Sequence, residues 1–183
     1  MALWIKQDEF DRKWGEAYRS VFSRAVLPDR PFKNSSWAVV LLVGGLRLND
    51  VEAGAVAELA TSLGDVEYVA VDAERKFPRN QLAVIGEWTA DPIRTHFGSW
   101  LGHTTVHLFG RSSTWGLVAS NEDLSILGAP RGHTEVFVSR VGGEEYLRAK
   151  FLEEFAENPY VFGGPDSESR FDRLLQLAAW VRD

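Results

Sequence analysis

Two histidines four residues apart are the first candidates for chemistry. His103 and His107 stand in the segment HTTVH, and on a helix this spacing would bring two imidazoles to one metal ion. The β-branched residues at positions 104–106 favour a strand instead. Positions four apart on a strand lie about 13 Å from each other, because a strand rises about 3.3 Å per residue. The pattern therefore predicts no shared metal ion.

A second candidate is the segment EYVAVDAERK, in which an apolar strand leads into Asp72, Glu74 and Lys76. An acidic residue, one spacer and a lysine at a strand end resemble the second half of a PD-(D/E)xK nuclease site. The resemblance implies that the carboxylates hold Mg²⁺ and that the lysine steadies the attacked phosphate or positions water. Such a site also needs an acidic residue on a neighbouring strand, for which Asp65 is too close in sequence and Asp50 is better placed as a helix cap. If these residues are catalytic, the protein is a metal-dependent nuclease or hydrolase, which we keep as the alternative function. If they are not, the segment is a charged loop between two strands.

Other catalytic patterns are incomplete in the sequence. There is no cysteine for thiol catalysis, and Ser112, Ser113 and Ser120 stand in expected turns without a G-x-S-x-G elbow. The segment VGGLRLND lacks the G-x-G-x-x-G spacing and the Walker lysine, and Asp50 would repel a phosphate there. We therefore expect no catalytic residues, no cofactor and no metal, and a protein that is not an enzyme.

Aromatic and acidic residues beside polar breaks suggest a binding surface. Trp88, Trp100 and Trp115 stand at the ends of expected elements, and Glu122 and Asp123 supply an acidic rim in the segment SNED. Partly exposed tryptophans of this kind often dominate protein interfaces. The alternative is that these rings cover the edge of a sheet, because tryptophan is mostly buried. Trp14, Trp37 and Trp180 lie in apolar patterns and are expected in the core.

The charge balance limits the choice of partner. The net charge is −6, which disfavours a nucleic-acid ligand and suits a basic one. Charges from Lys6 onward interrupt the N-terminal segment, and the longest apolar run, residues 37–43, is too short to cross a membrane. The leading hypothesis is a cytoplasmic bacterial immunity protein that binds and neutralises a basic toxin domain.

Helical patterns occur near both ends and once in between. Apolar spacing predicts helices over residues 8–25, 144–158 and 167–181, and the pair Asn49 and Glu52 predicts a capping box for a helix that Gly64 ends. Asp91 before Pro92 predicts a short helix to Leu101.

Strand patterns fill the middle of the chain. They predict strands over residues 37–43, 66–72, 81–88, 104–109, 114–120, 124–127 and 134–139. The polar segments GRSST and SNED fall where an antiparallel meander must reverse. The sequence thus predicts one α+β domain over residues 1–183, with a mostly antiparallel sheet of about six to seven strands covered by N-terminal and C-terminal helices.

Overall fold

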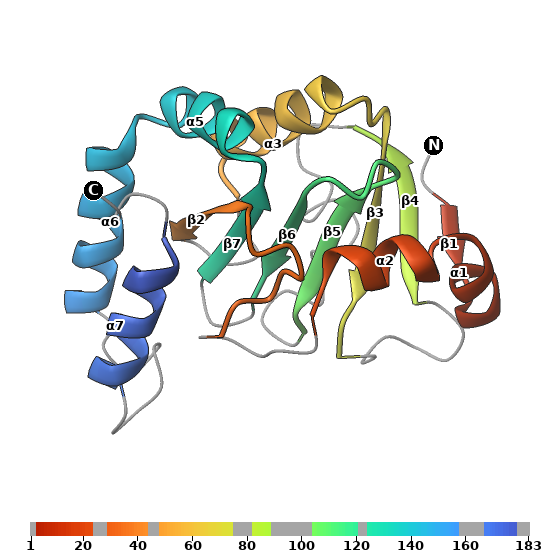
Figure 1. Cartoon of the computed structure of the whole chain (residues 1–183), viewed down its shortest axis with the longest axis horizontal. Coiled ribbons are helices and arrows are strands. Elements are labelled where there is room, and N and C mark those ends of the chain that lie inside the picture. The colour runs from red at the N-terminus through yellow and green to blue at the C-terminus, as the bar shows by residue number, and fades with distance from the viewer. Residues whose placement is uncertain are drawn as a thin grey trace.

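An antiparallel sheet is the centre of the computed structural model, which describes residues 3–23, 29–43, 48–74, 82–88, 104–120, 124–157 and 167–178. In these residues the sheet has seven strands in the order β1-β4-β3-β5-β6-β7-β2, and every neighbouring pair is antiparallel (Figure 1). The strands are β1 (Leu3–Ile5), β2 (Ala38–Val43), β3 (Glu67–Asp72), β4 (Ala83–Glu87), β5 (Val106–Gly110), β6 (Gly116–Ala119) and β7 (Leu124–Ala129). The predicted α+β class is confirmed.

The helices lie on both faces of the sheet and at one edge. Within the described residues they are α1 (Gln7–Lys13), α2 (Gly15–Val21), α3 (Asp50–Ser62), α5 (Arg131–Arg140), α6 (Glu144–Glu157) and α7 (Ser167–Leu177). Residues of α3 and α5 pack into the core on one face, and residues of α1, α2 and α7 pack into the core on the other. No helix in the described ranges has both the length and the apolar character that crossing a membrane requires.

The central strands are buried on both faces, which explains their continuous apolar runs. On β3, Tyr68 and Ala70 belong to the core beneath α3 and α5, whereas Val69 and Val71 belong to the opposite core. This division follows from the alternation of side chains along a strand. The run at residues 37–43 is buried for the same reason, and the strand predicted there is confirmed as β2.

Helix α6 protects the edge of the sheet that β2 forms. Its Leu147 lies in one core and its Phe151 in the other, so the helix spans both faces beside the edge strand (Figure 1). Covering an edge in this way removes a surface on which another chain could add a strand. The opposite edge is the three-residue strand β1, whose shortness has a similar effect.

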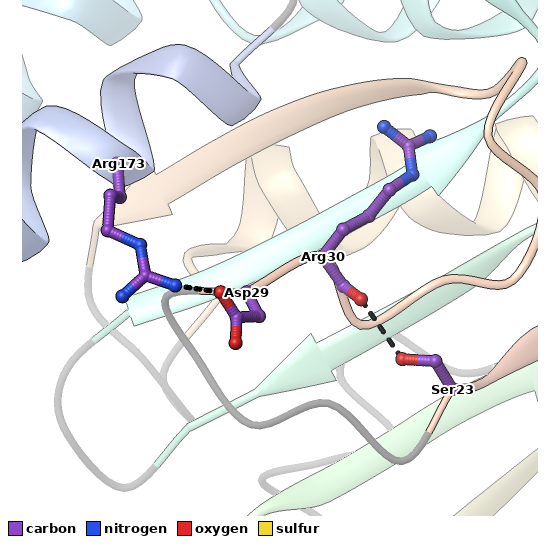
Figure 2. Close-up of polar contacts among 4 residues, drawn as sticks. All are labelled: Ser23, Asp29, Arg30 and Arg173. Carbon is purple, nitrogen blue, oxygen red and sulfur yellow. Dashed lines mark hydrogen bonds and ion pairs between the residues drawn. The ribbon is translucent and has the colours of Figure 1, made fainter.

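The connection between α2 and β2 is fastened by polar contacts. Phe22 and Phe32 form an isolated antiparallel bridge, and the Ser23 hydroxyl donates to the carbonyl oxygen of Arg30 at 3.0 Å. Asp29 forms an ion pair with Arg173 of α7, as Figure 2 shows. These contacts join the connection to α7, so the C-terminal helix is held near the N-terminal part of the chain.

The strand predicted over residues 134–139 is wrong, because this segment lies in helix α5. Its β-branched and aromatic residues suggested a strand. However, Thr134, Phe137, Val138 and Val141 are buried, and their spacing of three, four and seven residues is that of one helix face. Burial of this face against α3 and β2 outweighs the local preference for a strand.

The predicted N-terminal helix is also wrong in its extent. Two short helices, α1 and α2, occupy this segment and are separated at Trp14, which has a non-helical φ of −129°. Helix α2 ends at Val21 because the extended backbone of Phe22 pairs with Phe32. Residues 24–25 of the predicted helix, and the short helix predicted from Asp91, lie outside the described residues.

Candidate partner-binding surface

One side of the candidate surface forms at the C-terminal end of α3. Gly64 has a φ of +87°, and its amide donates to the Thr61 carbonyl while the Asp65 amide donates to the Ala60 carbonyl, both at 3.0 Å. These two bonds form a Schellman motif, which needs a residue with positive φ and therefore favours glycine. The reversal buries Asp65 and leaves the next residue, Val66, 74% exposed. The predicted stop at Gly64 and the predicted capping box of Asn49 and Glu52 are both confirmed.

Asp65 is an internal acceptor that joins α3 to the β5–β6 turn. Its carboxylate accepts hydrogen bonds from the amide of Ser112 at 2.7 Å, the hydroxyl of Ser112 at 2.6 Å and Nε1 of Trp115 at 2.8 Å. Gly110 lies against this carboxylate so closely that any Cβ there would collide with it. Asp65 therefore has a structural role, and Ser112 is a turn residue as predicted.

The expected partial exposure of Trp115 is wrong. Its side chain is fully buried, because the carboxylate of Asp65 accepts the indole hydrogen inside the protein. Trp14 and Trp37 are also buried, which confirms their expected place in the core, whereas Trp180 lies outside the described residues.

Trp88 follows β4 and is held from behind by two buried rings. Its ring centroid is 5.6 Å from that of Trp115 and 5.4 Å from that of Tyr68. Gly86 is paired with Tyr68 across the two strands, and a Cβ there would come within 2.7 Å of the phenol oxygen. Burial raises the pKa of Tyr68 to about 12, so this ring stays neutral. The indole of Trp88 is therefore supported by rigid, uncharged neighbours.

The outer side of Trp88 faces a surface depression of about 400 Å³, which we call the Trp88 depression. It is lined by Thr61, Val66, Glu67, Glu87 and Trp88, which come from the end of α3, the start of β3 and the end of β4. The elements that supply these residues are drawn at the upper right of Figure 1. Trp88 is partly exposed, but its Nε1 is buried and has no hydrogen-bond acceptor in the part of the chain that the structure describes.

Glu67 and Glu87 line the Trp88 depression, but their side chains point to the opposite face of the sheet from Tyr68, Gly86 and Trp88, because side chains alternate along a strand. They are directly opposite each other in the register of β3 and β4, an arrangement that is unfavourable for like charges. Neither carboxylate forms a hydrogen bond or ion pair within the described ranges. The C-terminal end of α3, which has no basic residue in its last turn, lies on the face of the sheet that holds Tyr68 and Trp88.

Three of the other predicted contact residues, Trp100, Glu122 and Asp123, fall outside the described residues. Of the two predicted residues that the structure describes, Trp88 lines this depression and Trp115 does not. Val66, Glu67 and Glu87 were not predicted. A signal for the acidic pair exists, since Glu67 opens the segment EYVAVD and Glu87 closes the segment AVIGE. An antiparallel pairing of these two segments sets the first residue of one against the last of the other.

The carboxylates of the nuclease-like segment are engaged near the start of β5. Asp72 is buried and accepts hydrogen bonds from the Thr104 hydroxyl and, at 3.1 Å, from the Glu74 amide. Glu74 accepts from the amide of Thr105 at 3.0 Å and from its hydroxyl at 2.8 Å. Lys76 lies outside the described residues. Among the residues with a described structure, no group of three or more His, Asp or Glu side chains is arranged to hold a metal ion.

His107 lies on β5, as the β-branched pattern predicts, and His103 falls outside the described residues. The Nδ1 atom of His107 is 2.8 Å from the hydroxyl oxygen of Tyr18, and the His107 ring stacks on Phe22 with 4.4 Å between the centroids. Burial among these rings lowers the pKa of His107 to about 4. The imidazole is therefore neutral at pH 7 and packs as part of the core.

Comparisons of the chain with protein-family models, with curated proteins and with solved structures found no match.

Proposed function

We propose that this chain is a protein-interaction module that binds a basic protein partner at the Trp88 depression. An immunity protein that neutralises a bacterial toxin is the most specific form of this proposal. The observation that supports it is the partly exposed indole of Trp88 in a depression that the exposed Val66 also lines.

The support behind Trp88 favours binding because it lowers the cost of ordering the side chain. A side chain that is already fixed loses little conformational entropy when a partner covers it. Trp88 is fixed by Tyr68 and Trp115, and Trp115 is fixed in turn by Asp65. The exposed Val66 extends the apolar part of the surface next to the indole. Rigid aromatic residues surrounded by such contacts are typical of interface hot spots.

The opposed carboxylates of Glu67 and Glu87 stand at the ends of the same two strands, on the other face of the sheet, and favour a partner of opposite charge. Two carboxylates that repel each other in the free protein are relieved when a basic side chain approaches, so the pair contributes to electrostatic steering. The net charge of −6 acts in the same direction at longer range.

A binding assay with the products of neighbouring genes tests the proposal. Each purified product, in particular a large secreted one, is titrated with the wild-type chain and with the Trp88→Leu variant. We expect one basic product to bind, and we expect the variant to weaken that complex by about 30-fold, as for the loss of a hot-spot tryptophan. Growth of cells that express the toxin with and without the chain then measures neutralisation.

Controls separate binding from folding. The Glu135→Gln variant removes one exposed charge on α5, at a residue that does not line the Trp88 depression, and should bind like the wild type. Circular dichroism and urea unfolding establish that Trp88→Leu is folded. Failure of every neighbouring product to bind would overturn the immunity proposal, and unchanged binding by folded Trp88→Leu would remove the binding site from this surface.

A further inference from the structure

We draw no further inference here: the strongest candidate, the exposed surface patch just after β5 where the guanidinium group of Arg111 lies over the buried ring of Trp14, carries none because nothing in the described part of the chain shows what anionic partner would cover it.

Discussion

Trp115 and Trp88 are in contact, yet their polar surroundings differ. The indole of Trp115 is fully buried and donates to Asp65, whose carboxylate also accepts two bonds from Ser112. The indole of Trp88, with its centroid 5.6 Å away, has no acceptor in the described part of the chain. On the other face of the same strands, Glu67 and Glu87 oppose each other without a partner in that part of the chain.

The comparison shows two kinds of polar group. Some form hydrogen bonds that stabilise the fold, and others have no partner within the described residues. A buried carboxylate with three donors satisfies the requirement that internal polar atoms be hydrogen-bonded. Two unpaired carboxylates in direct opposition make a local arrangement that folding alone does not favour. Departures of this kind are expected where a protein binds something. Each prediction below tests whether a given group belongs to the first kind or to the second.

The largest effect is expected at Asp65. Asp65→Ala leaves the indole of Trp115 and the amide of Ser112 without their acceptor in the core, so the free energy of unfolding should fall by about 3–5 kcal/mol. Urea unfolding followed by circular dichroism measures this loss. Asp65→Asn retains one acceptor oxygen and should lose less. A loss below about 1 kcal/mol for Asp65→Ala would contradict the internal role of this carboxylate.

His107 tests the same principle on the opposite face of the sheet. Its folded pKa of about 4 lies below the ordinary value of 6.5, so the unfolded chain binds more protons between these pH values. The contribution of neutral His107 to the free energy of unfolding is therefore fully present above about pH 6.5. It is lost as the pH decreases toward 4, and the loss is at most about 3 kcal/mol. Parallel unfolding series for the wild type and His107→Gln isolate this contribution, because the other groups titrate in both proteins.

The contrast between the two pH series decides the result. His107→Gln should lack the part of the acid destabilisation that His107 causes, while retaining the part due to carboxylates. Identical pH dependence in the two proteins would show that the imidazole is protonated without cost, and that its packing against Phe22 and Tyr18 does not require the neutral form.

Much of the fold could be predicted because its signals are local. The capping box of Asn49 and Glu52, the stop at Gly64 and the apolar run of β2 are each visible within a few residues. The β-branched residues of segment 134–139 are typical of a strand, but the buried residues Thr134, Phe137 and Val138 have the spacing of one face of helix α5. Here the packing of one helix face decides the structure, as tertiary context often does.

The candidate site was predictable only in part, because its causes are distant in the sequence. Trp88 was identified from its place beside a polar break. The burial of Trp115 depends on its hydrogen bond to Asp65, which is fifty residues away in the sequence. No local sequence pattern predicts that bond. The opposition of Glu67 and Glu87 requires the register of β3 and β4, which a sequence leaves open until the pairing of the strands is known.

A smaller effect is expected at Asn49, where Glu52 is another internally bonded carboxylate. Glu52 is buried and accepts a bond from the Asn49 amide at 2.9 Å, while the Asn49 side chain accepts from the amides of Val51 and Glu52. Asn49→Ala should lower the free energy of unfolding by about 1 kcal/mol through loss of the cap. Asn49→Ser restores an N-terminal cap and should stay within a few tenths of the wild type. Equal losses in the two variants would contradict the capping role.

The smallest effect, and the one with the opposite sign, is expected at Glu67. Glu67→Gln removes one of two opposed charges and should raise the free energy of unfolding by about 0.2–1 kcal/mol. The gain should shrink in 1 M salt, where charges are screened beyond about 3 Å. Glu135→Gln, without an opposing carboxylate on a neighbouring strand, controls for the general effect of reducing the negative charge.

The double variant makes this last prediction sharper. Once Glu67 is neutral, Glu87→Gln has no repulsion left to relieve. The gain in the free energy of unfolding of the double variant should therefore be smaller than the sum of the gains of the two single variants. A loss of stability in Glu67→Gln would mean that its carboxylate supports the fold as Asp65 does. The distinction between the two tryptophans would then disappear, because both would rest on carboxylates that serve the interior. A gain that salt abolishes means instead that the free protein retains a repulsion that a positively charged partner would relieve.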